Sequence, residues 1–452
     1  MNSVHVGIDV GTTNITLVAY ELHQKEIPSC LSMPNRRLFT DEAYAYAQDP
    51  HAIEQSVRTL LKSIKQPIAS ISVTGQVHGI LYYNKDGKGV SPLYTWLDQR
   101  AMQAVDGITS QQLLYEKTGE LLPSGYGLLA HYANRRLGKV PPEAVGFCGI
   151  LEYITSRLIG SPITRSDPSC LGTYGAFDPV TQQFDQIVLN EVLGSKNGQF
   201  LEASLPFSIA GYTPEGVPVT FPVGDNQAGV FGMVSAWQQS ALISIGTSGQ
   251  ISLFSTSSEC PPSMELRPFL EQGFLHVGAT LTAGKAYETL EKFLLSVCEA
   301  AGIEVDDEQV FTFMKNVSAT GNEDNPLVVD TRFSGSRKDP SIRGSIQNIG
   351  LDNFNLGNLV LGTVDGIIKE LHDFSIDSAA VFKKVESIVA TGSSVRKNIL
   401  FTNSLTRQFQ MPVRIAQIDD GAGFGIALIG AVATHAMTLE TTRAVVHAML
   451  GT

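Results

Sequence analysis

The stretch GIDVGTTNITLVAY, residues 7–20, decides the fold, because a similar stretch, ALISIGTSGQISLF, returns at residues 241–254. In both stretches apolar residues alternate on either side of a tight Gly-Thr turn, a pattern that predicts a β-hairpin. The turn GTT at residues 11–13 corresponds to GTS at residues 246–248. A single hairpin of this kind is common, so a repeat requires further matching pairs.

Two further pairs of segments follow. ISVTGQ at residues 71–76 resembles VATGSS at residues 389–394, each an apolar strand that enters a Thr-Gly turn. AGVFG at residues 228–232 resembles AGFGIA at residues 422–427, each inside a helix-like apolar run rich in small residues. Because the three pairs occur in the same order in both halves, the sequence predicts a duplicated domain with insertions.

Strands alternate with helical stretches between the repeats, which predicts α/β lobes. We expect a first lobe over residues 1–222 and a second over residues 223–452. Two such lobes should face each other across a central cleft, and clefts between domains are where ligands bind.

The composition is that of an ordinary globular protein, with 43% hydrophobic and 17% charged residues in a chain of 452. The formal net charge is −12 and no block of Lys or Arg stands out, which argues against nucleic acid or an anionic membrane as a partner. The most apolar run, residues 424–433, is too short to span a bilayer.

The five cysteines are odd in number and include no CxxC pair, so neither a disulfide framework nor a zinc site is indicated. The N-terminus enters an apolar strand without a basic leader region, and we expect no signal peptide. Both features favour a reducing cytoplasm. The chain is compatible with a homodimer.

The two Gly-Thr turns are candidate phosphate-binding loops. Glycine permits close approach of the backbone, and successive N–H groups and threonine hydroxyls can bind phosphate oxygens. Asp9 precedes the first turn and could hold Mg²⁺ through water, although a turn-capping role explains it equally well. No Walker loop competes: GATLTAGKA at residues 278–286 is one residue too long and has Ala286 where Ser or Thr is required. GAGFG at residues 421–425 is not a dinucleotide fingerprint.

Five motifs in order now resemble one family. They are TGQVHG (74–79), WLDQR (96–100), GDNQAG (224–229), SIGTSG (244–249) and ATGSS (390–394), and together they look like the FGGY carbohydrate kinases. The resemblance extends from about Val6 to about Ala433. It implies two actin-like (ribonuclease H-like) lobes, ATP and Mg²⁺ as cofactors, and a sugar as the other small-molecule partner.

The resemblance also implies a role for each matching position. These roles are Asp225 as general base; Gln76, His78, Asp98, Arg100 and Asn226 as substrate-binding residues; Thr12 and Thr13 in the first phosphate loop; Gly246 and Thr247 in the second; Gly392 and Ser393 at the adenosine; and Asp9 at the metal. Phosphoryl transfer needs positioning and charge stabilisation more than covalent help, and this set supplies both.

Structural roles compete with several of these assignments. Asp225 could be a helix N-cap, and Arg100 could pair with Asp98 as structure rather than bind a ligand. His78 could be an ordinary satisfied histidine. The sequence also departs from the family pattern, with Ser336 where Glu is typical and Ala390 where Gly is frequent.

Three segments, residues 166–178, 276–286 and 344–359, are similar to the branch of the family that phosphorylates sedoheptulose. Xylulose is the alternative substrate. A non-kinase actin-like ATPase would share the phosphate loops and the duplication, but it would not need the sugar-side residues. A polyphosphate hydrolase is a third alternative, and it would require a glutamate that positions the attacking water.

Overall fold

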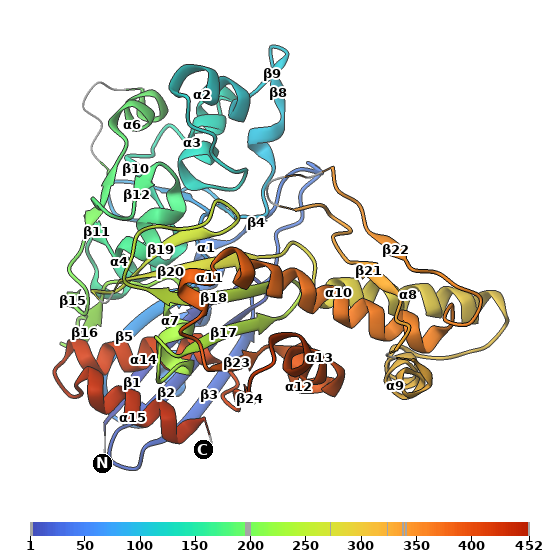
Figure 1. Cartoon of the computed structure of the whole chain (residues 1–452). Coiled ribbons are helices and arrows are strands. Elements are labelled where there is room, and N and C mark those ends of the chain that lie inside the picture. The colour runs from blue at the N-terminus through green and yellow to red at the C-terminus, as the bar shows by residue number, and fades with distance from the viewer. Residues whose placement is uncertain are drawn as a thin grey trace. The chain divides into compact units, whose positions relative to one another are not determined.

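The computed structural model describes residues 3–194, 200–271, 273–322, 324–336, 339 and 341–450. The chain divides into two compact units. The first comprises Met1–Ser235, Arg267–Gly273 and Ile418–Thr452, and the second Ala236–Leu266 and Phe274–Gln417. Each unit carries a mixed sheet, and each is described by itself (Figure 1).

The sheet of the first unit has the strand order β15-β16-β5-β1-β2-β3. The first hairpin is antiparallel, with Val10 of β1 opposite Ile15 of β2, and β1 is also parallel to β5. This confirms the hairpin and the following strand expected from the sequence. The strands are β1 (Val4–Val10), β2 (Asn14–Glu21), β3 (Glu26–Pro34), β5 (Ile68–Gly75), β15 (Ile209–Tyr212) and β16 (Pro218–Thr220).

The second sheet repeats this arrangement in the order β19-β20-β18-β17-β23-β24. Its hairpin of β17 and β18 is antiparallel, and β17 is parallel to β23. Hairpin and parallel strand therefore recur in the same relation, which confirms the duplication. The strands are β17 (Ser240–Ile245), β18 (Gly249–Ser255), β19 (Glu265–Phe269), β20 (Gly273–Ala279), β23 (Ser387–Thr391) and β24 (Val413–Ile415).

The two repeats also share a glycine at the end of the parallel strand, with the same kind of backbone conformation and the same close backbone contact. Gly75 ends β5 with φ +140°, and a Cβ there would lie 2.3 Å from the carbonyl oxygen of Val10. Gly392 follows β23 with φ +103°, and its Cβ would lie 2.3 Å from the carbonyl oxygen of Ile245. Only glycine tolerates both this backbone conformation and this approach, which explains the Thr-Gly motif in both repeats.

The remaining elements are shorter or lie around the sheets. In the first unit they are β4 (Ala47–Gln48), α1 (Pro50–Ser63), β6 (Leu81–Tyr83), β7 (Leu93–Tyr94), η1 (Arg100–Met102), β8 (Ala104–Val105), β9 (Ile108–Thr109), α2 (Ser110–Thr118), α3 (Gly127–Arg136), β10 (Gly146–Cys148), α4 (Ile150–Ile159), β11 (Arg165–Ser166), α5 (Pro168–Leu171), η2 (Gly172–Tyr174), β12 (Phe177–Asp178), β13 (Gln183–Phe184), α6 (Gln186–Leu193), β14 (Glu202–Ala203), α7 (Asp225–Met233), α14 (Gly421–Ala433) and α15 (Leu439–Met449). In the second they are α8 (Gly284–Ala300), α9 (Asp307–Val317), η3 (Ser318–Thr320), β21 (Val328–Asp330), β22 (Ser345–Gln347), α10 (Leu356–Asp377), α11 (Ala379–Phe382), α12 (Ser393–Lys397) and α13 (Ile399–Phe409).

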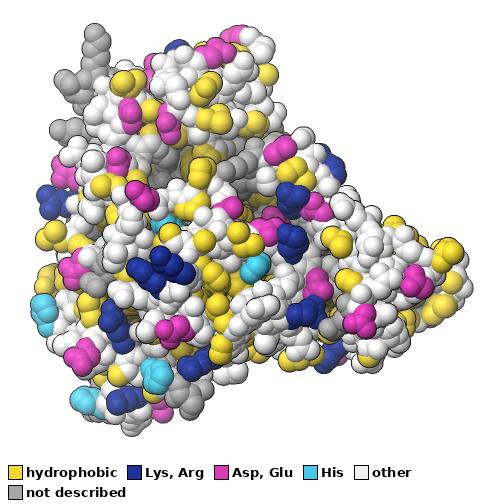
Figure 2. Space-filling model, in the orientation of Figure 1, with side chains coloured by type: hydrophobic (Ala, Val, Ile, Leu, Met, Phe, Trp, Pro, Cys, Tyr) yellow, Lys and Arg dark blue, Asp and Glu magenta, His cyan; other side chains and the backbone are white. Residues whose placement is uncertain are grey.

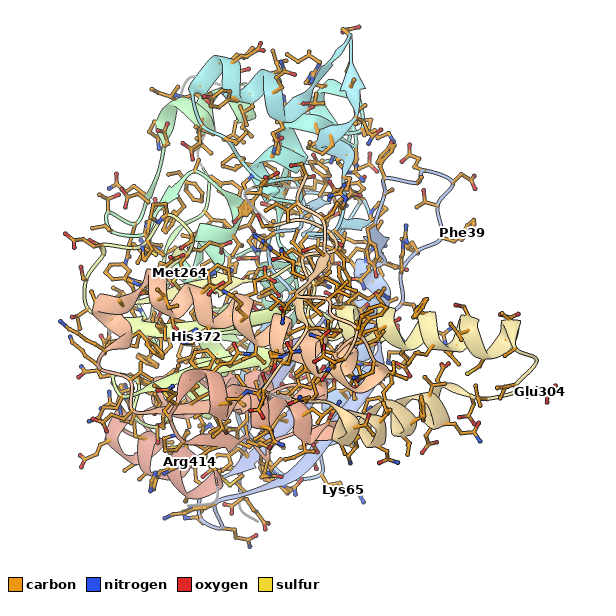
Figure 3. The ribbon with its side chains drawn as sticks, turned by 45° about the vertical axis from the view of Figure 1, so that its right-hand side comes forward. Phe39, Lys65, Met264, Glu304, His372 and Arg414 are labelled. Carbon is orange, nitrogen blue, oxygen red and sulfur yellow. The ribbon has the colours of Figure 1, made fainter. Side chains whose placement is uncertain are left out.

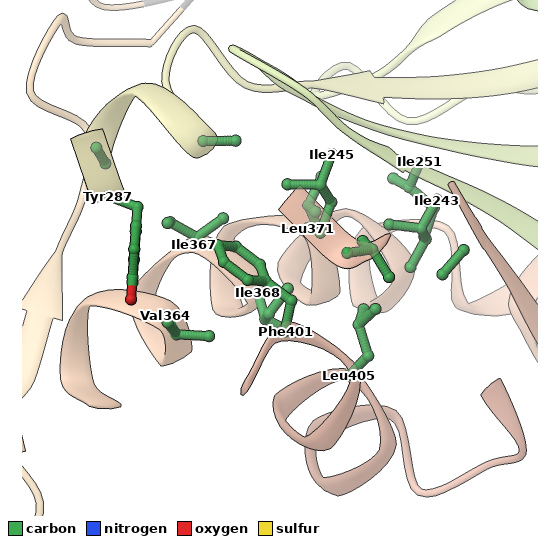
Figure 4. Close-up of a cluster of buried hydrophobic side chains, with 14 of the residues drawn as sticks. Ile243, Ile245, Ile251, Tyr287, Val364, Ile367, Ile368, Leu371, Phe401 and Leu405 are labelled. Carbon is green, nitrogen blue, oxygen red and sulfur yellow. The ribbon is translucent and has the colours of Figure 1, made fainter. Parts of the chain in front are cut away.

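The core of the second unit lies between its sheet and helices α10 and α13 (Figure 4). Helix α10 buries Val364, Ile367, Ile368 and Leu371, whose spacing of three and four residues gives one apolar face. This face packs with strand residues such as Ile243 in one buried cluster. The helix thereby covers the sheet close to the turn between β17 and β18, where a Cβ on Gly249 would lie 3.3 Å from Leu371.

The third sequence pair corresponds to helices α7 and α14, which pack closely together in the first unit. A Cβ on Gly425 would lie 1.9 Å from the carbonyl oxygen of Ala228, and one on Gly232 would lie 2.6 Å from the backbone of Gly425. Helix α14 also covers β1 and β5, beside which it is drawn in Figure 1. Residues from Ile418 onward thus count with the first unit, whereas the sequence suggested one boundary at residues 222/223.

Surface features agree with the bulk composition. On the face shown in Figure 2 basic and acidic side chains are interspersed. Phe39, which is 95% exposed, and Glu304 at the turn between α8 and α9 both project from the ribbon (Figure 3). All five cysteines lie in the described part of the chain and are free. Among the described residues, no helix is long and apolar enough to cross a membrane.

We predict that Gly232→Ala and Gly425→Ala each lower the stability by about 1–3 kcal/mol, because the added methyl group forces two helix backbones apart. Gly229→Ala is the matched control. It lies in the same helix α7, and its Cβ would meet only the end of the Met233 side chain at 3.4 Å. That change should be neutral or stabilising by up to about 1 kcal/mol. Thermal unfolding followed by circular dichroism measures the difference, and equal effects of all three substitutions would contradict the close helix contact.

Candidate active site

Three carboxylates of the first unit influence one another: Asp9 on β1, Asp225 at the start of α7, and Asp420 before α14. Burial raises the pKa of Asp9 well above its usual range, and the negative charges of Asp420 and then Asp225 raise it further. The Oδ1 atom of Asp9 is buried and has no hydrogen-bond partner among the described residues. Among the described residues, this oxygen atom therefore has no compensating hydrogen bond.

Asp420 is held by its own helix. Its side chain accepts a hydrogen bond from the backbone N–H of Gly423 at 2.7 Å and so caps α14. Burial raises its pKa, while the hydrogen bonds from Gly423 and Thr16 oppose that shift. Asp420 is accordingly fixed beside the first hairpin.

Asp225 is the first residue of α7, and its side chain is exposed to solvent. Although the residue keeps contact with solvent, desolvation of its carboxyl by the surrounding atoms raises its pKa, and the positive charge of Arg267 and the hydrogen bond from Asn226 oppose that rise. Its Oδ1 accepts from the N–H of Asn226 at 2.7 Å. The helix cap is Gly224, which makes no side-chain cap, so the N-cap alternative for Asp225 is not what the structure contains.

The loop that carries Asp225 is anchored from both sides. Thr74 of β5 donates a hydrogen bond to the carbonyl oxygen of Val223 at 2.7 Å. Ser169 accepts from the N–H of Gly224 at 2.9 Å and itself donates to Asp167 at 2.6 Å. A carboxylate on so well-fixed a loop is suited to act on a positioned ligand.

The donor set of this region fits a hard divalent cation. Carboxylate oxygens are the ligands that Mg²⁺ prefers, and a cation would offset the mutual repulsion of the three aspartates. Among the described residues, however, no group of three His, Cys, Asp or Glu side chains converges closely enough to bind a metal directly. This pattern suits a magnesium ion that keeps most of its water ligands, with Asp9 as the buried carboxylate nearest the first turn.

The first Gly-Thr turn is tied to the sugar-side residues. The Thr12 hydroxyl donates to Oε1 of Gln76 at 3.3 Å, and Nε2 of Gln48 donates to the Thr12 carbonyl oxygen at 2.8 Å. Gln76 in turn donates to Gln48 at 2.7 Å. Thr13 is exposed at the tip of the turn. The structure therefore brings together Thr12 and Gln76, which sequence analysis placed in different sites.

Trp96 and His78 also lie near this turn in the fold. Trp96 donates from Nε1 to the Thr12 hydroxyl at 3.1 Å and is 40% exposed, so it is not a core residue. His78 has φ +74° and stacks on Tyr126 with ring centroids 4.4 Å apart. Its Nδ1 contacts the carbonyl oxygen of Thr173 at 3.0 Å. A left-handed backbone at a non-glycine residue is the kind of strain that functional sites retain.

Asp98 and Arg100 form a closed ion pair. Arg100 donates to Oδ1 at 2.7 Å and to Oδ2 at 2.9 Å, and the two side chains are only 2% and 3% exposed. Oδ2 also accepts from the N–H of Tyr46. The Arg100 guanidinium lies 3.5 Å from the ring centroid of Tyr94. The pairing considered as the structural alternative is thus present, and contact of either residue with substrate stays a prediction.

The candidate nucleotide residues of the second unit converge on one turn. The carbonyl oxygen of Gly246 accepts from Gly284 at 2.9 Å, and that of Thr247 accepts from Lys285 at 3.1 Å, so the turn rests on the start of α8. Gly392 contacts the backbone of Ile245, and Ser393 begins α12. A Cβ on Gly392 would lie 2.3 Å from the carbonyl oxygen of Ile245 and one on Gly284 would lie 2.4 Å from that of Gly246, whereas a Cβ on Gly246 itself would meet open space.

Several residues of the site escaped the sequence analysis. Asp420 carried a usable signal, because it precedes the second small-residue helix much as Asp225 begins the first. Arg267, Gln48 and Ser169 carried none, since each lies far in sequence from the residue that it positions. Asn226, expected on the substrate side, is buried with 7% exposure beside Asp225.

Two family models match nearly the whole chain. Residues 4–232 match the N-terminal domain, and residues 241–434 the C-terminal domain, of the FGGY family of carbohydrate kinases. Among the similar curated proteins, sedoheptulokinase of Homo sapiens is 24% identical over 94% of this chain and 97% of its own. Xylulose kinase of Staphylococcus xylosus is also 24% identical, over 94% and 90%.

Solved structures share the fold. The gluconate kinase of Lactobacillus acidophilus superposes with a TM-score of 0.83 at 20% identity, covering 98% of this chain and 92% of that one. A ligand-bound xylulose kinase of the same organism gives 0.82 at 20% identity, with 97% and 91% coverage. The duplicated α/β units, the paired glycine turns and the two family matches agree, and the chain belongs to the FGGY family of carbohydrate kinases.

Proposed function

We propose that the protein transfers the γ-phosphoryl group of ATP to the terminal hydroxyl of a ketose, with sedoheptulose as the preferred substrate and sedoheptulose 7-phosphate as the product. Membership of the family makes it a sugar kinase that uses a sugar and ATP. The observation that carries the proposal is Asp225, a solvent-accessible carboxylate on an anchored loop with a raised pKa.

The proposed reaction needs one proton acceptor. Asp225 takes the proton of the sugar hydroxyl as that oxygen attacks the γ-phosphorus, and the bond from this phosphorus to the bridging oxygen of ADP breaks. A raised pKa brings the carboxylate nearer in basicity to the operating pH, which favours proton transfer. Arg267 keeps the group ionised by opposing that rise.

The phosphates are proposed to bind at the two Gly-Thr turns, through backbone N–H groups and the hydroxyls of Thr12, Thr13 and Thr247. The surface at Gly392 and Ser393 is proposed for the adenosine. When bound, Mg²⁺ neutralises charge on the phosphates. Asp9 is proposed to hold this ion through water, which gives its buried, uncompensated carboxylate a partner.

The sugar is proposed to lie against Gln76, His78 and Trp96. These residues offer an amide, an imidazole and an apolar wall, and all three are linked to fixed backbone or to the first turn. Asp98 and Arg100 stand behind this surface. We assign them to positioning, because their polar atoms already bind one another.

The choice of sugar rests on the curated relatives. Human and mouse sedoheptulokinases match at 24% and 25% identity over 94% of the chain. Xylulose kinases match at similar identity, so xylulose is the second candidate. The position of Ser336, which borders a cavity of the second unit, offers no choice between the two.

The acid limb of the activity profile tests Asp225. The base works only when deprotonated, so kcat/KM should fall as the pH drops through its raised pKa. Because Arg267 lowers that pKa, Arg267→Met should move the acid limb to higher pH. Asp225→Asn should lower kcat by about 10²–10⁴-fold.

Arg58→Met is the control for these rate profiles, since Arg58 forms an exposed ion pair with Glu54. It should leave the acid limb in place. Near wild-type turnover in a folded Asp225→Asn protein would rule out the assignment of the base.

Asp9→Asn tests the metal role with two readouts. It should raise the Mg²⁺ concentration needed for half-maximal rate by about tenfold or more. It should also raise the melting temperature of the metal-free protein, because one of three repelling carboxylates becomes neutral. Asp86→Asn, on an exposed turn, should change neither quantity. A lower melting temperature together with an unchanged Mg²⁺ requirement would contradict the assignment.

Specificity constants for D-sedoheptulose, D-xylulose and gluconate, measured by coupled ADP release, test the substrate. We expect sedoheptulose to be preferred by at least about tenfold, equivalent to about 1.4 kcal/mol. The reverse preference for xylulose would retain the kinase and reject sedoheptulose. ADP release that is equal with and without any sugar would identify an ATPase instead.

A further inference from the structure

A buried chain of hydrogen bonds leads away from Asp98 through the first unit. Arg100 donates from one guanidinium nitrogen to Oδ1 of Asn134 at 2.6 Å. Nδ2 of Asn134 donates to the hydroxyl oxygen of Tyr82 at 3.2 Å, and that hydroxyl contacts Nδ1 of His131 at 2.8 Å. Asn134 is fully buried, Tyr82 is 1% exposed and His131 is 8% exposed.

Arg100 determines which group donates and which accepts in each of these hydrogen bonds. Arginine has only donors, so the atom of Asn134 that faces Arg100 must be the oxygen, and its nitrogen must donate to Tyr82. The Tyr82 hydroxyl then has one hydrogen to give, and Nδ1 of His131 is the acceptor in reach. A neutral His131 consequently carries its hydrogen on Nε2.

His131 is neutral at ordinary pH. Burial and, to a smaller extent, the nearby charge of Arg135 lower its pKa to about 4. Its ring is also fixed in orientation, because it stacks on Phe147 with centroids 4.2 Å apart and an interplanar angle of 20°. The outward nitrogen is therefore a fixed hydrogen-bond donor.

His131 lines a cavity of about 1030 Å³ in the first unit. Aromatic rings of Phe147, Phe184 and Phe200 form part of the wall, with Phe147 and Phe200 5.0 Å apart. The polar part of the lining includes the amides of Gln182, Gln183 and Gln186 and the charged side chains of Arg165 and Glu202. None of these residues belongs to the proposed sugar, phosphate or metal positions discussed above, and all lie in the first unit.

We propose that this cavity is a second ligand site, and that it binds a small planar heteroaromatic compound of the nucleoside or nicotinamide type. The ring would stack on the aromatic wall, and a ring nitrogen or carbonyl oxygen would accept the hydrogen bond from Nε2 of His131. Stacking on aromatic faces and one directed donor select a flat ring that carries an acceptor. The glutamines offer both donors and acceptors to the remaining polar groups of such a compound.

The site is also joined to the sugar side through the chain of hydrogen bonds. A ligand acceptor at His131 would complete a series of five side chains that ends at Asp98, the residue that holds the N–H of Tyr46. The proposal concerns binding in the cavity and does not depend on the kinase assignment.

Isothermal titration of the full-length protein with uridine and with nicotinamide tests the site, with ribose as the non-aromatic comparison. His131→Phe keeps the ring volume and removes the donor. It should weaken binding of both heteroaromatic probes by about tenfold, the value of one well-formed hydrogen bond. His5→Phe is the matched control, because His5 is equally buried, bonds Ser70 through Nδ1 at 2.8 Å and lies on β1. It should change affinity by less than about twofold.

A second variant covers the case in which His131→Phe does not fold. Tyr82→Phe removes the hydroxyl that donates to Nδ1, so the neutral imidazole is no longer held with its hydrogen on Nε2, and binding of both probes should weaken. Saturable binding that responds to His131 or Tyr82 and not to His5 supports the site. Absence of saturable binding of either probe in the millimolar range overturns it. So does binding that neither substitution affects, since such binding lies elsewhere on the protein.

Discussion

The close backbone contact between helices α7 and α14 is the constraint on which the first unit depends. Gly232, Gly421 and Gly425 leave no room for side chains there, and Gly7 and Gly423 allow α14 to approach β1 equally closely. Helix α14 belongs to the second half of the sequence repeat. This contact nevertheless packs it against the sheet of the first unit. Because Asp225 begins one helix and Asp420 caps the other, this packing also fixes two of the three interacting carboxylates.

In that arrangement the negative charges of Asp420 and Asp225 lie close enough to Asp9 to disfavour its ionised form. The Oδ1 atom of Asp9 is buried without a hydrogen-bond partner among the described residues, and burial together with the charges of Asp420 and Asp225 raises the pKa of Asp9 well above its usual range, so its ionised form is costly in the protein alone. A stable core elsewhere must offset this cost, and the buried apolar clusters under both sheets supply it. The Mg²⁺ ion proposed above would supply the missing positive charge.

The buried polar groups around Asp98 differ from Asp9, because they are paired with one another by hydrogen bonds. Asp98, Arg100, Asn134, Tyr82 and His131 are almost fully buried and satisfy one another in a fixed direction. Such a network specifies one arrangement, because each of these hydrogen bonds has a donor and an acceptor that cannot exchange roles. At one end Asp98 accepts a hydrogen bond from the N–H of Tyr46, and at the other end His131 lines a separate cavity. A residue that resembles a substrate ligand by its motif can therefore serve the site through its neighbours.

The sequence by itself determined the duplication, the two hairpins, the strands that end in Thr-Gly, the small-residue helices and the family. These are local patterns, set by alternation, by spacing and by glycines that the backbone requires. Tertiary structure alone decided which groups meet. It assigned residues 418–450 to the first unit, set Arg267 against Asp225, turned Asp98 and Arg100 towards each other, and aimed His131 into a cavity. Those outcomes depend on contacts between residues far apart in the chain and on the desolvation that close packing imposes, and neither is encoded in any local run of residues.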